Sequence, residues 1–421
     1  MHFSERVRSL RESSTLAVSA RAAALRARGE DVIGFGAGEP DFDTPEPIRA
    51  AAIAALNAGK TRYTATAGEI TARRAIASKL ERENGVACTA DDVVITVGAK
   101  HAIYLSLQCL LDPGRGQEVI LPTPAWVSYR PLIELAGGRC IELPTSMESG
   151  FRIDPAALAA AITPRTTAVI LNSPSNPCGI ALPPGDIEAI ATVLAARPDI
   201  VVISDEIYEK LIYPEITPGL RHLSPGSLPA LRARTITING LSKAFAMTGW
   251  RIGYLAAPSG SGFAAEVAKL QGQMTNNITS FVYDSIVTAL EMPGATLEAM
   301  RAAFAERAKV IDARLRSVPG LECVAPNAAF YAFPRVRSHF GTASPGGRLI
   351  DSAAAFAEAL LDEAKVAVVP GEDFGDVARD HVRLSFACGL PAIEKGVDRI
   401  GEFCGSLRRV AAPVGSASGG E

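Results

Sequence analysis

The 421-residue sequence lacks any long uninterrupted apolar run. None of its segments reaches the roughly 18 consecutive apolar residues that a transmembrane helix needs. The N-terminus, which begins Met1-His-Phe-Ser-Glu-Arg6, has no apolar signal-peptide core. The segment from Ala17 to Arg28 is rich in alanine and arginine, as transit peptides are, but acidic residues flank it on both sides. The sequence therefore predicts a cytoplasmic protein without a membrane partner.

Paired cysteines and a strong net charge are also missing. The seven cysteines are odd in number and have no CxxC or CxxH spacing, which argues against a zinc site or a disulfide framework, and we expect no metal. The net charge is only −3, so nothing predicts a nucleic acid as partner. Apolar residues make up 48% and charged residues 21% of the chain, as in an ordinary globular enzyme large enough for two or three domains.

Apolar, β-branched runs alternate with alanine-rich stretches between about residues 90 and 255. Such runs, without polar alternation, are typical of strands that are covered on both faces. The pattern predicts an α/β fold with a mostly parallel central sheet and helices on both faces. The expected strands are 92–97, 118–121, 167–171, 200–204, 235–238 and 252–255, with a helix at 99–111.

The pattern changes near residue 300, where long helical segments alternate with short apolar strands. This change predicts a second, smaller α+β domain. Its expected helices are 295–318 and 351–364, its expected strands are 329–333 and 381–386, and 335–350 is expected to be a loop. We predict four units: an N-terminal arm at 1–45 that packs with the small domain, a large domain at 46–300, a small domain at 301–410 and a disordered tail at 411–421.

Ligands of open α/β sheets bind beyond the carboxyl ends of the strands, so the residues that follow each expected strand are the candidate site. Gly98-Ala-Lys-His101 begins a helix, where free N–H groups and the helix dipole favour a phosphate. Trp126 follows the next strand and could stack on an aromatic ring. Asn176 lies in a proline-rich turn, where its amide could donate a hydrogen bond. The alternatives are an ordinary turn at residues 98–101 and at Asn176, and a core position for Trp126.

Two charged residues follow the remaining strands. Asp205, at a buried strand end, needs a partner, and the protonated nitrogen of an electron-accepting pyridine ring would suit it. Tyr208 could reach an oxygen on that ring. Lys243 could form a Schiff base with an aldehyde cofactor, whose phosphate Arg251 could hold. A helix N-cap aspartate and a solvated lysine are the ordinary alternatives, but a fitting group at each of five strand ends favours a pyridoxal-phosphate enzyme.

Four motifs resemble those of a known family, and the resemblance extends from about residue 13 to residue 405. The family is the class I/II pyridoxal-phosphate aminotransferases of fold type I, and in particular the aspartate aminotransferase subgroup called I-beta. The resemblance implies a homodimer with shared active sites. The motifs are Ala37-Gly-Glu-Pro-Asp-Phe-Asp43, Ser173-Pro-Ser-Asn-Pro177, Ser204-Asp-Glu-Ile-Tyr208 and Lys243-Ala-Phe-Ala-Met-Thr-Gly-Trp-Arg-Ile-Gly253.

The resemblance also implies a role for each candidate residue. Lys243 would form the Schiff base with the cofactor, and Asp205 would pair with the pyridinium nitrogen. Tyr208 and Asn176 would hydrogen-bond the ring hydroxyl oxygen, and Trp126 would stack on the ring. On the phosphate, the implied ligands are the backbone of Gly98, Ala99 and Lys100, the side chain of Arg251, and Tyr63 from the neighbouring subunit. On the substrate, Arg383 would bind the α-carboxylate and Gly38 would lie against the backbone.

One absence bears on the substrate. Better-known aspartate aminotransferases bind the distal carboxylate with an arginine from the partner subunit, but this chain has no arginine between Lys269 and Arg301. In the I-beta subgroup a lysine at the position of Lys100 resembles a substitute. We therefore predict a ping-pong transaminase for L-aspartate and 2-oxoglutarate, with prephenate as an additional acceptor, in which the Lys243 amine moves the proton.

Several alternatives remain at this point. The chain departs from the subgroup pattern at Ala99, at Cys178 and at Asn327-Ala-Ala-Phe330, and the last departure leaves the substrate preference open. The same cofactor contacts would serve a transaminase for aromatic or small neutral amino acids, a β-lyase or a decarboxylase. A ligand-sensing regulator is disfavoured because no basic DNA-binding domain precedes the first motif.

Overall fold

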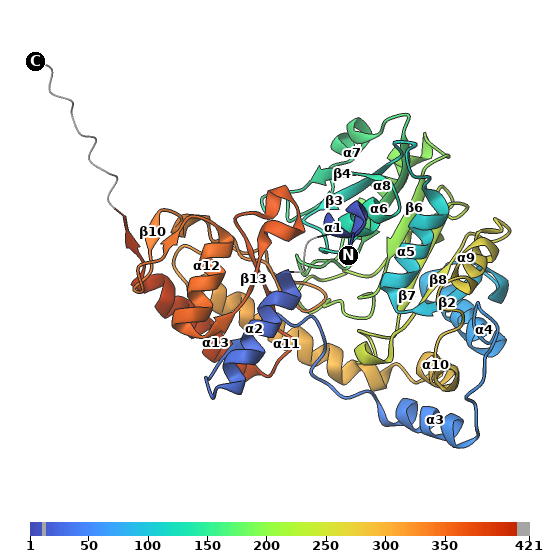
Figure 1. The fold of residues 1–421 in the computed structure, drawn as a ribbon, viewed down its shortest axis with the longest axis horizontal. Coiled ribbons are helices and arrows are strands. Elements are labelled where there is room, and N and C mark those ends of the chain that lie inside the picture. The colour runs from blue at the N-terminus through green and yellow to red at the C-terminus, as the bar shows by residue number, and fades with distance from the viewer. Residues whose placement is uncertain (11–13, 411–421) are drawn as a thin grey trace, which may run out of the picture.

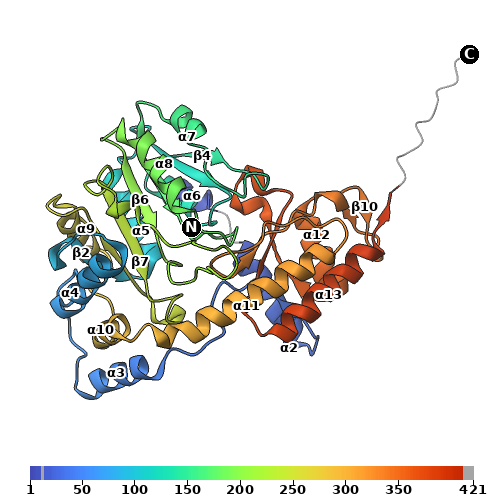
Figure 2. The ribbon, with the colours of Figure 1, turned by 180° about the vertical axis from the view of Figure 1, so that it is seen from behind.

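The computed structural model describes residues 1–10 and 14–410, so the predicted tail at 411–421 lies outside the described residues. Two bodies lie side by side in Figure 1, a larger one built around a sheet and a smaller one from the last third of the chain. The long helix α11 (Ala295–Ser317) extends from the first to the second, as both views show (Figures 1 and 2). In the described residues no helix is both long and apolar enough to cross a membrane.

A seven-stranded sheet with the strand order β2-β8-β7-β6-β5-β3-β4 forms the centre of the larger body. Strand β8 runs antiparallel to both of its neighbours, and the other pairs are parallel. This confirms the predicted mostly parallel sheet. The strands are β2 (Val93–Val97), β3 (Glu118–Thr123), β4 (Arg139–Pro144), β5 (Thr166–Asn172), β6 (Val201–Asp205), β7 (Thr235–Gly240) and β8 (Ile252–Ala256).

Helices cover both faces of this sheet, which explains why its strands are apolar without alternation. In β2, for example, Val94 packs in one core cluster while Val93 and Ile95 pack in another on the opposite face. The helices of the first face are α5 (Ala99–Leu110), α6 (Tyr129–Leu135) and α9 (Phe263–Gly272). Those of the second face are α4 (Ile70–Lys79), α8 (Pro184–Ala195) and α10 (Tyr283–Glu291), with α3 (Glu46–Asn57) against α10 and α7 (Pro155–Ala161) against α8.

The smaller body packs helices α11, α12 (Ala353–Ala359) and α13 (Leu390–Ser406) against short strands. One small sheet has the order β13 (Val369–Pro370), β14 (Val382–Ser385), β9 (Tyr331–Ala332). The segment 335–350, which we expected to be a loop, contains the paired strands β10 (Thr342–Ala343) and β11 (Leu349–Ile350). Strand β10 also pairs with β15 (Arg408–Arg409). The expectation was wrong because strands of two residues are held by backbone pairing and leave no alternating pattern in the sequence.

Residues 14–34 of the N-terminal segment pack with the smaller body. After α1 (Glu5–Arg8) and α2 (Ser14–Ala27), the short strand β1 (Ile33–Gly34) pairs in parallel with β12 (Val366–Ala367). The backbone of Phe35 continues this contact, since its N–H donates to Ala367 and its carbonyl accepts from Ser385. The chain then passes Gly38 on its way to α3. Residues 36–39 are therefore held beside the carboxyl edge of the large sheet.

Candidate active site

A cavity of about 300 Å3 lies at the carboxyl edge of the large sheet and is lined by residues of both bodies. Strand β8 also brings a residue to this edge, because it is antiparallel and its first residue, Ile252, pairs with the last residue of β2, Val97. Ten of the predicted site residues line the cavity together: Gly38, Ala99, Lys100, Trp126, Asn176, Asp205, Tyr208, Lys243, Arg251 and Arg383. Gly98 lies directly behind Ala99.

Besides Gly98, Tyr63 is the predicted site residue that does not line the cavity. It lies between α3 and α4, and its side chain is 86% exposed. A contact with the phosphate of a neighbouring subunit remains a prediction.

The start of α5 and the side chain of Arg251 form one end of the cavity. Gly98 caps the helix with a φ of 77°, and a Cβ at this position would overlap the Arg251 guanidinium. A Cβ at Gly253 would overlap the backbone of Gly98 and Ala99, so both glycines permit a close approach. The Arg251 guanidinium donates to the Thr248 carbonyl at 2.9 Å. A guanidinium beside the free N–H groups of a helix start is a suitable site for a phosphate.

Lys100 provides a second cation on the cavity wall. Its Nζ lies 4.8 Å from the centroid of the Trp126 ring, and in the described residues it forms no ion pair with a carboxylate. Partial removal from water, with a further contribution from the Arg251 charge, lowers the pKa of Lys100. An anionic group of a ligand would offset this charge.

Asp205 ends β6 and is 3% exposed. Its Oδ2 accepts a hydrogen bond from the Tyr129 hydroxyl at 2.7 Å, and its Oδ1 accepts from the backbone N–H of Ile207 at 3.2 Å. Burial raises the pKa of Asp205 to about 6, and these hydrogen bonds oppose the increase. No cationic side chain in the described part of the chain pairs directly with this carboxylate, so it suits a protonated ring nitrogen.

Lys243 lies in the turn after β7, and its Nζ donates to the carbonyl of Gly38. The aromatic rings of Phe330 and Tyr208 lie 5.8 and 6.0 Å from this nitrogen. Burial lowers the pKa of Lys243 to about 8, while the charge of Glu39 opposes the decrease. Roughly a tenth of the amine is therefore unprotonated at pH 7, far more than for an ordinary lysine, and a nucleophilic amine requires this form.

The lowered pKa of Lys243 predicts an effect on stability. In the cofactor-free protein the buried ammonium costs free energy below pH 8, and the cost disappears between pH 8 and 10.5 because the folded state loses this proton first. We expect Lys243→Met, which keeps the volume, to raise the free energy of unfolding at pH 7 by on the order of 1–3 kcal/mol. The gain should shrink toward pH 10.5 in urea unfolding; a gain that increases with pH would contradict the assignment.

Arg383, on β14, is a buried guanidinium at 2% exposure. Its Nη1 donates to Asn176 Oδ1 at 3.0 Å and its Nη2 to the Gly36 carbonyl at 2.8 Å, while Nε has no partner. The rings of Tyr331 and Phe374 lie 4.8 and 5.4 Å from its central carbon. In the described residues no carboxylate pairs with it, and burial lowers its pKa. A substrate carboxylate would compensate this buried charge.

The cavity also contains residues that sequence reasoning missed. Tyr129 could have been found, because it lies three residues after Trp126 and therefore on the same side of a helical turn. Tyr331 lies in an expected strand, but a strand that short does not show which face meets the site. Thr15 and Leu16, at the start of α2, follow no strand and have no signal in the sequence.

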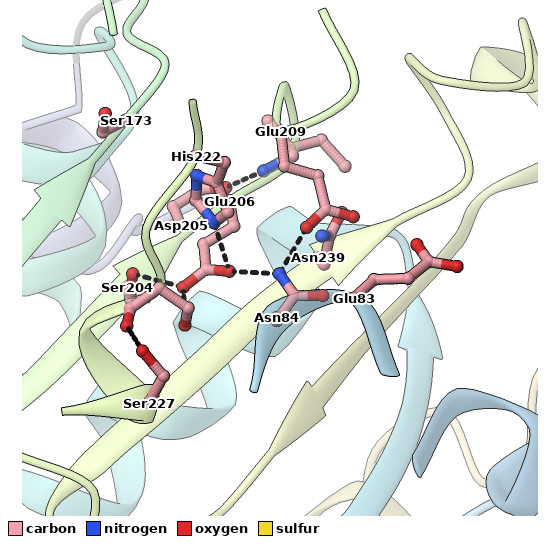
Figure 3. A network of polar contacts seen from close by, with 12 residues as sticks. Glu83, Asn84, Ser173, Ser204, Asp205, Glu206, Glu209, His222, Ser227 and Asn239 are labelled. Atoms are coloured by element: carbon pink, nitrogen blue, oxygen red, sulfur yellow. Dashed lines mark hydrogen bonds and ion pairs between the residues drawn. The ribbon is translucent and has the colours of Figure 1, made fainter. Parts of the chain in front are cut away.

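A buried polar network lies behind Asp205 (Figure 3). Glu206 accepts hydrogen bonds from Ser204, at 2.8 Å, and from Asn84, at 3.0 Å, and contacts His222 at 2.8 Å. Ligand atoms of Glu206, Glu209 and His222 lie within 4.8 Å of one another, as in a metal site. However, the ammonium of Lys79 already pairs with Glu209 and, against the effect of burial, lowers its pKa to about 2. We therefore assign the network no metal.

Comparisons with known proteins agree with this geometry. The family model for aminotransferases of class I and II matches residues 30–400. The chain is 45% identical to an aspartate aminotransferase of Geobacillus stearothermophilus over 404 residues, which are 96% of this chain and 99% of that protein. It is 41% identical to an aspartate/prephenate aminotransferase of Cereibacter sphaeroides over 399 residues, which are 94% of this chain and 97% of that protein.

Solved structures give the same result. The aspartate aminotransferase of Rhizobium meliloti superposes with a TM-score of 0.91 at 38% identity, covering 97% of this chain and all of that one. That of Thermus thermophilus with maleate superposes with a TM-score of 0.87 at 39% identity, covering 96% of this chain and all of that one. The predicted fold and family are thereby confirmed: the chain belongs to the class I and II aminotransferases.

Proposed function

We propose that this aminotransferase is pyridoxal-phosphate dependent and transfers the amino group of L-aspartate to 2-oxoglutarate. The observation that supports this proposal most is that Lys100 and Arg383 lie in one cavity with the amine of Lys243 and have no carboxylate partner among the described residues. A dicarboxylic amino acid would neutralise both charges. Relatives that are named aspartate aminotransferases over nearly the full length support the same substrate.

The residues of the cavity fit pyridoxal phosphate. Because Gly98 has no Cβ, the Arg251 guanidinium can lie close to the start of α5, and together they form a site for the phosphate. Asp205 offers a buried carboxylate for the ring nitrogen. Trp126 lies at the cavity wall, where it can cover a face of the ring. The amide nitrogen of Asn176 has no protein partner in the described chain, because Arg383 uses only its oxygen, so this nitrogen can donate to the ring oxygen.

When bound, pyridoxal phosphate supplies an aldehyde and an electron-accepting ring. The amine of Lys243 would hold the cofactor and, once free, would act as the general base that takes a proton from the substrate Cα. The carboxylate of Asp205 keeps the ring nitrogen protonated. Arg383 holds the α-carboxylate by two parallel hydrogen bonds, and Lys100 holds the distal carboxylate.

Prephenate is proposed as an additional acceptor. It also has two carboxylates, so that the same two cations would bind it. Some relatives have names that include prephenate together with aspartate.

We also propose a homodimer in which Tyr63 reaches the neighbouring active site. Helix α3 buries Ile48 on one side, whereas Ile53 and Leu56 are 60% and 48% exposed. Tyr63 and Ile70, on the segment that follows, are exposed as well. Exposed large apolar side chains of this kind favour contact with a second subunit.

Lys100→Ala tests the dicarboxylate assignment. We expect the KM for aspartate to rise by about 10- to 100-fold, because one charge-assisted hydrogen bond is lost. The KM for alanine, which has no distal carboxylate, should change less than about twofold. Steady-state kinetics with a panel of amino donors and 2-oxo acids measures both values.

Lys269→Ala is the matched control, since the Lys269 side chain is 70% exposed and pairs with Glu266 on the surface. Equal losses for aspartate and alanine in Lys100→Ala would contradict the role of Lys100. A wild-type preference for aromatic donors would overturn the proposed substrate.

A further inference from the structure

We propose that Tyr331 is a positioning residue that directs the hydroxyl proton of Tyr208 toward the cofactor. This role presupposes the cofactor binding proposed above. It follows from a pair of buried hydroxyl groups: the two tyrosine oxygens lie 2.8 Å apart, and either could donate to the other. Both side chains line the cavity, and they are 4% and 1% exposed.

The number of protons restricts the arrangement. Each hydroxyl has one proton, and among the described residues neither makes another hydrogen bond. If Tyr208 donates to Tyr331, its own proton is used and only a lone pair of its oxygen faces the ligand. If Tyr331 donates to Tyr208, the proton of Tyr208 stays free to bind an anionic ring oxygen. Only the second arrangement makes Tyr208 a donor to the cofactor.

The charge of Arg383 favours Tyr331 as the donor. Its guanidinium lies over the Tyr331 ring at 4.8 Å, and a cation over a phenol ring withdraws electron density and strengthens the O–H group as a donor. Burial raises the pKa of both tyrosines, and the charge of Arg383 is the main effect that opposes this increase at Tyr331. The more acidic hydroxyl of a pair is the better donor.

Packing around the Tyr331 hydroxyl keeps it in this position. A Cβ on Gly38 would lie 2.8 Å from the hydroxyl oxygen, so that the glycine leaves just enough room for it. The ring of Tyr208 packs edge-to-face against the ring of Tyr331 at 5.8 Å and against that of Phe330 at 5.6 Å. Tyr331 thus contacts Arg383, the proposed ligand of the substrate carboxylate, with its ring, and it contacts Tyr208, the proposed ligand of the cofactor, with its hydroxyl group.

The test uses Tyr331→Phe, Tyr208→Phe and the double variant in the enzyme loaded with pyridoxal phosphate. The absorption band of the Lys243–cofactor linkage changes with pH as its nitrogen releases a proton. A ring oxygen that loses a donor holds that proton more strongly, so both single variants should raise the midpoint. We expect the midpoint to rise by about half a pH unit in Tyr331→Phe and by more in Tyr208→Phe.

The double variant decides between a direct and an indirect role. If Tyr331 acts through Tyr208, the midpoint of the double variant should equal that of Tyr208→Phe alone. In Tyr331→Phe we expect kcat for aspartate to fall about 3- to 10-fold and KM to stay within twofold. Additive shifts in the double variant, or an unchanged midpoint in Tyr331→Phe, would overturn the proposal.

Tyr213→Phe is the matched control for the loss of a buried hydroxyl. Tyr213 is fully buried, donates to the carbonyl of Ala329 and does not line the cavity. The melting temperature of Tyr213→Phe should fall as much as that of Tyr331→Phe, while the midpoint of its absorption change should equal that of the wild type. If the wild type shows no absorption band of the Lys243–cofactor linkage, cofactor binding is refuted, and the role of Tyr331 with it. A band that is present but does not change with pH would overturn the role of Tyr331 alone.

Discussion

Lys243→Ala is expected to reduce kcat for aspartate transamination by at least about 10⁴-fold, because the variant loses both the attaching amine and the general base. It should also lose the absorption band of the Lys243–cofactor linkage, although the phosphate contacts at Gly98 and Arg251 remain. Steady-state kinetics and absorption spectra of the purified variant measure the two effects. A retained band would show that another amine binds the cofactor.

A chemical control identifies the residue without relying on activity. Borohydride adds a hydride to a carbon–nitrogen double bond and leaves a stable single bond. Reduction of the loaded wild type should therefore attach the cofactor permanently to one peptide, the one that contains Lys243. Mass spectrometry of a digest would find this peptide, and label on any other lysine would contradict the assignment.

Arg383→Lys should lower kcat/KM by about 10²- to 10⁴-fold. A lysine keeps the charge but has no planar fork for two parallel hydrogen bonds to a carboxylate. Every amino acid has an α-carboxylate, so the loss should be similar for aspartate and alanine. This distinguishes Arg383 from Lys100, whose removal should affect aspartate alone.

The absorption band with pyridoxal phosphate serves as the control for Arg383→Lys. Arg383 contacts Asn176 and Gly36, not the proposed phosphate site, so the cofactor should still attach to Lys243. A loss restricted to dicarboxylates would show that Arg383 binds the distal carboxylate instead.

The strand ends explain why much of the site could be predicted. All six strands expected in the large sheet are present, with ends that differ by at most two residues. Parallel strands end at one edge, so residues far apart in sequence, such as Trp126 and Lys243, had to meet there. The assignment of roles came instead from the motifs and their resemblance to a family.

The missing parts depend on packing that no local pattern reveals. Strand β4 was missed because only Leu143 of its six residues is fully buried, so that it has no apolar run. Tyr129 meets Asp205 from 76 residues away, and Tyr331 meets Tyr208 from 123 residues away. The first pair joins a helix and a strand of the larger body, and the second joins the two bodies. A sequence pattern describes one element at a time and reveals neither contact.

The pairing of β1 with β12 also affects how the protein is made. Ile33 pairs with Val366, so this strand emerges from the ribosome about 330 residues before its partner. During most of translation, residues 33–38 therefore lack the backbone that orders them, and the Gly38 carbonyl has no fixed place beside Lys243. A nascent chain that ends before β12 would have a folded sheet but an incomplete catalytic centre, so activity begins only in about the last eighth of synthesis.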